Sequence, residues 1–86
     1  MRRTITWSDD AVGDLLKVAD VNRHQANRIR DAVTRFGRDE TGDIRKLRGV
    51  ANRWRLRVGD WRVMYEEESD RTLILEVLNR RDAYDD

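Results

Sequence analysis

The chain has 86 residues, of which 41% are charged and 38% hydrophobic, and its formal net charge is +1. At this length we expect one small domain, with room for one sheet and a few helices. Because the chain has no cysteine, no apolar run near its start and no segment as long as a membrane span, we expect no disulfide, thiolate metal site, signal peptide or membrane anchor, and a cytoplasmic location.

The N-terminal part predicts a strand followed by two helices. Residues 2–7 predict a short strand, and Ser8 is suited to cap a helix that runs to about Asp20. A second helix is expected over residues 23–36, folded back as an αα-hairpin because the junction at residues 21–22 is short. The buried faces are Ala11, Leu15 and Val18 in the first helix and Ala26, Ile29, Val33 and Phe36 in the second. The outer face of the second helix carries Arg28, Arg30, Asp31 and Arg35, which is typical of a solvated surface, with a nucleic-acid role as the alternative.

After a polar loop at residues 37–42 and a short strand at 44–47, the chain predicts a β-hairpin. Two alternating runs flank Gly59-Asp60, and such a glycine-containing two-residue loop is a hairpin signal. The predicted facing pairs are Val58 with Trp61, Arg57 with Arg62, Leu56 with Val63, Arg55 with Met64 and Trp54 with Tyr65. Since side chains alternate between faces, Trp54, Leu56, Val58, Trp61, Val63 and Tyr65 form the core face. We therefore interpret both tryptophans as core, with base stacking as the alternative.

The other face of the hairpin collects Arg53, Arg55, Arg57 and Arg62. Like charges directly opposite one another cost a sheet a few tenths to about 1 kcal/mol, so folding alone does not favour this arrangement. Residues 45–62 hold seven cations and one anion, although the whole chain is almost neutral. Because guanidinium forks match phosphate oxygens, the pattern indicates a site for a polyanionic ligand. The alternative is a solvated surface paired with Glu66 and Glu76.

The last strand is predicted at residues 73–78, before a polar tail at residues 79–86. An odd-numbered connection would place Leu73, Leu75 and Val77 on the core face and Glu76 on the arginine face near Met64, whereas an even one would bury Glu76. We choose the odd connection. The expected fold is α+β, a single domain over residues 1–86 with an N-terminal strand and an αα-hairpin packed on a mainly antiparallel sheet of four or five strands.

Four short motifs occur in a fixed order along the chain. They are Lys-Leu-Arg-Gly at residues 46–49, Trp-Arg-Leu-Arg-Val at 54–58, Trp-Arg-Val-Met-Tyr at 61–65 and Arg-Arg-Asp-Ala-Tyr at 80–84. Together with the element order, they resemble the RelE/ParE superfamily of toxins from type II toxin-antitoxin systems, over essentially the whole chain. The resemblance implies the RelE-like fold and a cognate antitoxin as partner. It also implies an endoribonuclease that cuts messenger RNA in the ribosomal A site, as in the favoured RelE branch; the alternative is a ParE-like inhibitor of DNA gyrase.

In the ribonuclease branch, the matching positions imply a set of site residues. The implied catalytic residues are Arg55, Arg57, Arg62, Arg80 and Tyr84, and we assign RNA binding to Lys46, Arg48, Arg53 and Arg81. The chain departs from the family pattern at two places. The family often has lysine where Arg55 and Arg57 stand, and some members have a histidine near the C-terminal site, where this chain has Asn79. The general base is therefore not assigned by the resemblance.

RNA can be cleaved without a metal or cofactor when its own 2′-hydroxyl attacks the adjacent phosphorus. Arginines at such a site can stabilise the developing anion, but they do not act as bases because their pKa stays above about 12. Tyr84 is the leading proton carrier, with Glu76 second, although Tyr84 could instead only pack its ring. We expect no metal site, and we read His24 as a surface or core residue because no second ligand lies near it in sequence. A toxin-like fold that survives as an inactive binding module is a third possibility.

Overall fold

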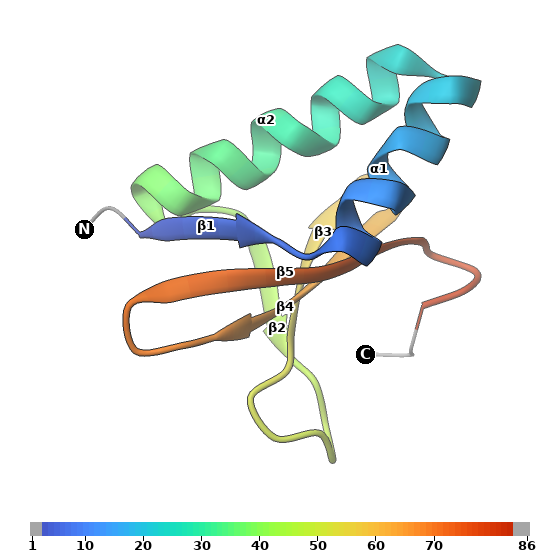
Figure 1. The fold of residues 1–86 in the computed structure, drawn as a ribbon. Helices are drawn as coiled ribbons and strands as arrows, with labels where there is room; N and C mark the ends of the chain where they lie inside the picture. The colour runs from blue at the N-terminus through green and yellow to red at the C-terminus, as the bar shows by residue number, and fades with distance from the viewer. Residues whose placement is uncertain (1–2, 84–86) are drawn as a thin grey trace.

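The computed structural model describes residues 3–83 and shows two helices packed on one side of a five-stranded sheet (Figure 1). The strands are β1 (Thr4–Trp7), β2 (Asp43–Lys46), β3 (Trp54–Val58), β4 (Trp61–Glu67) and β5 (Arg71–Asn79), and the helices are α1 (Asp9–Val21) and α2 (Arg23–Asp39). The sheet order is β1-β5-β4-β3-β2, in which only the β1–β5 pair is parallel. The expected α+β architecture is therefore confirmed. No helix within residues 3–83 is long and apolar enough to cross a membrane.

Both predicted helices form, and side-chain caps fix where they begin. The hydroxyl of Ser8 accepts a hydrogen bond from the Ala11 amide at 3.1 Å, as the sequence predicted. A single residue, Asn22, separates α1 from α2. Its amide donates to the Val18 carbonyl at 2.7 Å, and its side-chain oxygen accepts from the Gln25 amide at 3.2 Å. Because one residue ends the first helix and caps the second, the αα-hairpin forms without a longer connecting loop.

The second helix is longer than predicted, because Gly37 lies inside it and does not end it. The sequence predicted a loop from residue 37, but α2 continues to Asp39, and Glu40 follows in the left-handed conformation. Gly37 is buried against Ile5 of β1, and a Cβ atom at Gly37 would lie 2.6 Å from Ile5 Cγ1. This glycine thus lets α2 approach β1 closely.

The hairpin has the register that the sequence predicted. Val58 faces Trp61, Arg57 faces Arg62 and Trp54 faces Tyr65. The predicted core side packs against the buried faces of α1 and α2. The cluster includes Ala11, Val18, Ala26, Ile29, Val33, Phe36, Leu56, Val58, Val63 and Tyr65, with Leu15, Trp54 and Trp61 packed at its margin. Both tryptophans therefore belong to the core side of the sheet.

The predicted register of β5 is right at one end of the strand and wrong at the other. Val77 faces Val63 and Glu76 faces Met64, as expected. Nearer the turn, Ile74 faces Tyr65, because Leu75 is an extra residue in a β-bulge. Four residues connect Glu67 to Thr72, an even number that by itself would turn Glu76 toward the core. The extra residue of the bulge reverses this, so that Glu76 faces Met64 outside the core. Thr72 and Ile74 are consequently buried where Leu73 and Leu75 were expected.

The start of α1 binds the backbone of β5 around this bulge. The Ser8 amide donates to the Ile74 carbonyl and the Ser8 hydroxyl donates to the Leu75 carbonyl, both at 2.9 Å. The Val77 amide donates to Asp14 Oδ2 at 3.0 Å. Buried backbone groups need such partners, so a helix distant in sequence stabilises the irregular strand.

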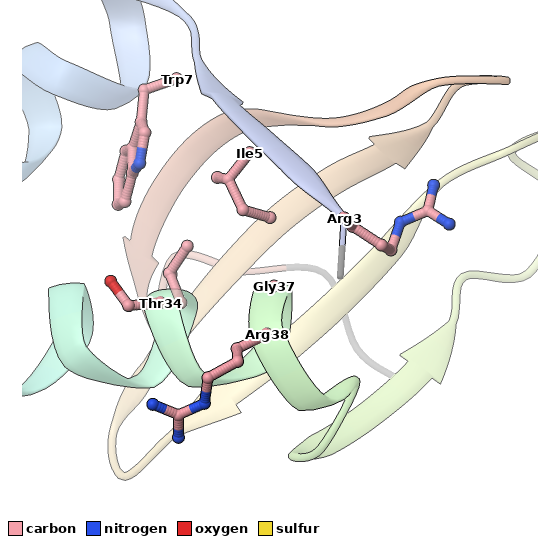
Figure 2. A pocket seen from close by; sticks show the side chains of 7 residues that line it. Arg3, Ile5, Trp7, Thr34, Gly37 and Arg38 are labelled. Carbon is pink, nitrogen blue, oxygen red and sulfur yellow. The ribbon is translucent and has the colours of Figure 1, made fainter. Parts of the chain in front are cut away.

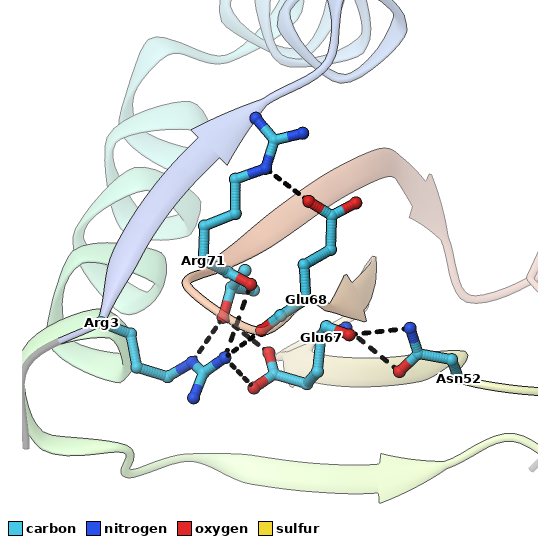
Figure 3. Close-up of polar contacts among 6 residues, drawn as sticks. Arg3, Asn52, Glu67, Glu68 and Arg71 are labelled. Atoms are coloured by element: carbon cyan, nitrogen blue, oxygen red, sulfur yellow. Dashed lines mark hydrogen bonds and ion pairs between the residues drawn. The ribbon is translucent and has the colours of Figure 1, made fainter.

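Arg3 ties the β4–β5 turn to the N-terminal strand (Figure 3). Its Nε donates to Thr72 Oγ1 at 2.8 Å, and its Nη2 lies 2.7 Å from Glu67 Oε2. The Thr72 hydroxyl donates to Glu67 Oε1 at 2.6 Å, and Asn52 Nδ2 donates to the Glu67 carbonyl at 2.7 Å. This network holds the end of the sheet that lies away from the hairpin turn.

Candidate functional site

The two helices cover one face of the sheet (Figure 1). The register places the arginine-rich side of the hairpin on the opposite face. Register places its side chains in rows across the strands. The row nearest the hairpin turn is Asp43, Arg57, Arg62 and Leu78, and the next is Arg45, Arg55, Met64 and Glu76. We call this surface the arginine face. It brings residues from all four strands of the meander together, and the N-terminal elements do not contribute to these rows.

Arg62 lies at the electrostatic centre of the arginine face. It is half-buried, and its Nη1 donates to the carbonyls of Gly59 at 3.1 Å and Trp61 at 3.2 Å. Burial lowers the pKa of its guanidinium, and three neighbouring guanidinium groups lower it further. These neighbours are Arg57, Arg55 and Arg80, while the Asp43 carboxylate acts in the opposite direction. Three of the four other predicted catalytic residues are therefore close enough to Arg62 to act on its charge.

Arg57 is exposed and lies directly opposite Arg62. Its Nε donates to the Gly59 carbonyl at 3.5 Å, so Arg57 and Arg62 share one acceptor at the hairpin turn. Within residues 3–83, neither side chain forms an ion pair with a carboxylate. This pair of like charges is the part of the face best suited to hold an anion.

Arg55 differs from the expectation of an outward-facing, accessible side chain, because it is only 5% exposed. Its Nη1 donates to the Asp43 carbonyl at 3.0 Å and lies 3.3 Å from Asp43 Oδ1. Met64, in the same row, is also buried, with long side chains on either side of it in Arg55 and Glu76. The aliphatic parts of these long side chains help to shield Met64 from solvent. Arg55 is therefore less accessible to a large ligand than the exposed Arg57.

Two other predicted arginines have carboxylate neighbours. Arg53 Nε lies 3.2 Å from Glu66 Oε1, with both side chains half-buried. Arg80 Nη1 lies 3.9 Å from Asp60 Oδ1, with both exposed, which makes this pair weak. The Arg80 amide also donates to the Asp60 carbonyl at 2.7 Å, which holds the C-terminal segment beside the hairpin turn.

The remaining predicted site residues are not gathered on the arginine face. Lys46 shares its row with Trp54, on the helix-covered side, and its amine lies 5.8 Å from the centroid of the Trp54 ring. Arg48 is exposed in a turn after β2. Arg81 lines a cavity of about 430 Å³ on the helix-covered side, beside Trp61 and the end of α1. Tyr84 lies outside the described residues.

Sequence reasoning missed two residues of the arginine face. Asp43 and Arg45 of β2 lie opposite Arg57 and Arg55. Their register could not be predicted, since residues 47–53 between β2 and β3 contain no tight-turn signal as clear as Gly59-Asp60. The alternation of Asp43, Arg45 and the apolar Ile44 was the available signal. Asp43 matters because it forms an ion pair with Arg55 and its charge acts on Arg62 against the repulsion by the neighbouring arginines.

A separate apolar groove lies between β1 and α2 (Figure 2). Its volume is about 320 Å³, and Ile5 and Trp7 of β1 and Val33 of α2 contribute to its lining. Arg3 and Arg38 also line it. On α1, beyond Trp7, Leu16 is 62% exposed. This groove has no groups for acid-base chemistry and is suited to apolar contacts.

The fold is that of the toxins of the RelE/ParE superfamily, which belong to type II toxin-antitoxin systems. The family model described as the ParE toxin of the type II toxin-antitoxin system parDE matches residues 5–84. The chain belongs to this family.

Known relatives carry names from both branches of the superfamily. The toxin RelE3 of Methanocaldococcus jannaschii is 40% identical over 43 residues, and the chain spans about half the length of this curated relative. The solved RelB-RelE antitoxin-toxin complex from Methanococcus jannaschii matches with 25% identity and a TM-score of 0.64, over 88% of this chain and 91% of that one. The chromosomal ParDE system from P. aeruginosa matches with 12% identity and a TM-score of 0.74, over 90% and 95%. The fold is therefore common to both branches and does not separate them.

Proposed function

We propose that this toxin is a metal-independent endoribonuclease that cleaves messenger RNA at the ribosomal A site. The observation that carries the proposal is the approach of Arg57, Arg55 and Arg80 to Arg62 on a face that no helix covers. Such convergence destabilises the free protein, and a bound phosphate would offset the repulsion. Arg57 and Arg62 form no carboxylate ion pair within residues 3–83, so their charge is available to a ligand.

In the proposed reaction, the 2′-oxygen of the RNA attacks the adjacent phosphorus and the bond from phosphorus to the 5′-oxygen breaks. The products are a 2′,3′-cyclic phosphate and a 5′-hydroxyl. The 2′-hydroxyl gives up one proton, and the leaving 5′-oxygen takes up one. Arg57 and Arg62 stabilise the negative charge of the pentacoordinate phosphorus, a role typically worth on the order of 10²–10³ in rate for each preorganised donor. Arg80 approaches from the C-terminal segment, and buried Arg55 holds Asp43, which lies opposite Arg57.

Proton transfer is assigned to Tyr84, with Glu76 as the second choice. Neighbouring guanidinium groups favour the anionic form of a phenol, which otherwise ionises near pH ~10. Glu76 lies in the arginine-face row with Met64 and Arg55, and it is half-buried. The ribosome would supply much of the alignment of the 2′-hydroxyl, which lets a site without histidine react.

We further propose a cognate antitoxin as the natural partner. The RelB-RelE relative was solved as an antitoxin-toxin complex, which supports such a partner here. The apolar groove between β1 and α2 (Figure 2) fits an apolar segment of that antitoxin. The exposed Leu16 extends the apolar surface beyond Trp7. The arginine face would take its acidic side chains.

Inhibition of DNA gyrase is the second candidate function, and the match to the ParE family model favours it. It is a protein-binding activity and needs no proton carrier. In that case the arginine face would serve as a docking surface, and Tyr84→Phe would leave the toxicity unchanged.

Mapping of 5′ ends of messenger RNA on purified ribosomes tests the proposal. Wild type is expected to produce discrete new 5′ ends at the position of the ribosomal A site. Arg62→Ala and Tyr84→Phe are each expected to reduce their rate of formation at least about 100-fold. Arg23→Ala is the matched control, because Arg23 is exposed at the start of α2, away from the arginine face. Inhibition of gyrase supercoiling by wild type, with messenger RNA left intact, would reject the ribonuclease.

A further inference from the structure

A second group of arginines lines a cavity beside the arginine face, where α2, the α2–β2 loop and the hairpin turn meet. The cavity has a volume of about 400 Å³. Its polar lining comes from Arg28 and Arg35 of α2, Arg57 of β3, Thr41, Gly42 and Gly59. The volume falls within the range of roughly 300–1,000 Å³ that is typical of ligand pockets. It is therefore large enough for more than a single small ion.

Gly59 brings this cavity next to the arginine face. A Cβ atom at Gly59 would lie 3.1 Å from Arg28 Nη1 and 3.2 Å from Arg28 Nη2, so the missing side chain lets the Arg28 guanidinium lie against the turn. The carbonyl of the same residue accepts hydrogen bonds from Arg57 and Arg62. Three guanidinium groups from α2, β3 and β4 thus meet around one glycine, and Arg57 belongs to both the cavity and the arginine face.

The charge in this cavity is not balanced by its own lining, which contains three arginines and no carboxylate. Arg28 and Arg57 form no ion pair within the described part of the chain. Arg35 is near Asp39, but the pKa of Asp39 is lowered mainly by its hydrogen bond with Arg38, and Arg35 has only a minor effect on it. Thr41 adds a hydroxyl that can donate a hydrogen bond. The unbalanced cations indicate an anionic ligand.

We propose that this cavity is a subsite for a backbone phosphate of the RNA, adjacent to the phosphate that is cleaved. The inference rests on the proposed ribonuclease function and extends it from one phosphate to two. Arg57 lies between the two positions, while Arg28 and Arg35 hold the flanking phosphate and its sugar occupies the rest of the cavity. Planar guanidinium forks favour phosphate oxygens, and continuity through Arg57 favours a chain that already lies on the arginine face. An acidic peptide is the competing occupant.

Binding of a short 2′-O-methyl RNA, which cannot undergo 2′-hydroxyl attack, tests the subsite separately from catalysis. Fluorescence anisotropy would compare wild type with Arg28→Gln and Arg35→Gln, and Arg23→Gln on the same helix serves as the control. Each cavity variant is expected to weaken binding about tenfold, as for a lost charge-assisted contact. The plot of log affinity against log salt is also expected to become less steep by about 0.7 in each cavity variant. On ribosomes, both should need more toxin for half-maximal cleavage and keep the rate at saturation.

The outcomes separate this subsite from the proposed function. If both cavity variants bind RNA like Arg23→Gln, the subsite is rejected even if messenger RNA is cleaved. If they bind weakly while wild type cleaves nothing, the subsite stands and the ribonuclease is rejected. Competition decides the occupant: sodium tripolyphosphate is expected to displace the RNA at lower concentration than an oligoglutamate peptide does. The reverse order would assign the cavity to an acidic protein segment and overturn the proposal.

Discussion

Removing the charge of Arg62 tests whether the arginine face is electrostatically strained in the free toxin. Arg62→Met removes the guanidinium and keeps an unbranched side chain. Arg62→Lys keeps the charge and loses the planar fork. Since Arg57 lies directly opposite, with Arg55 and Arg80 also near, Arg62→Met should relieve a repulsion that Arg62→Lys retains.

The expected free-energy change combines two opposing contributions. Relief of like-charge repulsion across the strand pair is worth a few tenths to about 1 kcal/mol. The loss of the hydrogen bonds from Arg62 Nη1 to the carbonyls of Gly59 and Trp61 costs about 0.5–1.5 kcal/mol each, toward the lower end because Gly59 is exposed and water can replace the donor. At low salt we therefore expect the free energy of unfolding of Arg62→Met to lie within about 1 kcal/mol of wild type, while RNA cleavage falls at least about 100-fold.

Salt separates the two contributions. The Debye length falls from about 30 Å at 0.01 M salt to about 3 Å at 1 M, so high salt removes the repulsion but leaves the hydrogen bonds. Between these conditions, Arg62→Met should lose up to about 1 kcal/mol relative to wild type, or roughly 4–8 °C in Tm for a domain of this size. The difference between Arg62→Lys and wild type should not change with salt.

Thermal denaturation followed by circular dichroism measures both differences, and general effects of salt cancel in them. A difference between Arg62→Met and wild type that stays constant within ~0.3 kcal/mol, the usual limit of additivity, would refute the electrostatic reasoning. So would an equal salt response of Arg62→Lys. In either case Arg62 would be a structural residue at the hairpin turn.

Two further predictions concern the core. Gly37→Ala should destabilise the fold by about 1–3 kcal/mol, because the new Cβ would lie 2.6 Å from Ile5 Cγ1. Gly13→Ala should stabilise it by up to ~1 kcal/mol, since nothing lies within 4 Å of a Cβ at that position. Thermal denaturation of both variants checks this prediction, and equal effects would contradict it. Burial, and to a smaller extent the Glu67 carboxylate, raises the pKa of Tyr65, while Arg3 has a smaller opposite effect. The neutral Tyr65 side chain therefore contributes fully to stability below the unfolded pKa of about 10, and this contribution is lost as pH rises above that value. In urea denaturation between pH 7 and 11, Tyr65→Phe should lose less stability than wild type at the alkaline end, and parallel curves would disprove the assignment.

Local patterns in the sequence determined the helices and the hairpin. Ser8 and the apolar spacing of the two helices predicted their starts and buried faces, because capping and helical periodicity act within a few residues. The Gly59-Asp60 turn predicted the full register of β3 and β4, since a two-residue loop leaves only one pairing in which the core side is apolar. Of the candidate site, the sequence therefore predicted which arginines share a face and that Arg57 lies opposite Arg62.

Only the tertiary structure decided the features that depend on contacts between distant segments. The bulge at Leu75 exists where Ser8 and Asp14 bind the backbone of β5, and no pattern within β5 predicts it. Arg55 has an ion pair because β2 brings Asp43 beside it, and Arg28 reaches Gly59 because α2 crosses near the hairpin turn. Side-chain periodicity assigns a residue to a face, whereas accessibility and neighbouring charge depend on what the rest of the chain places there.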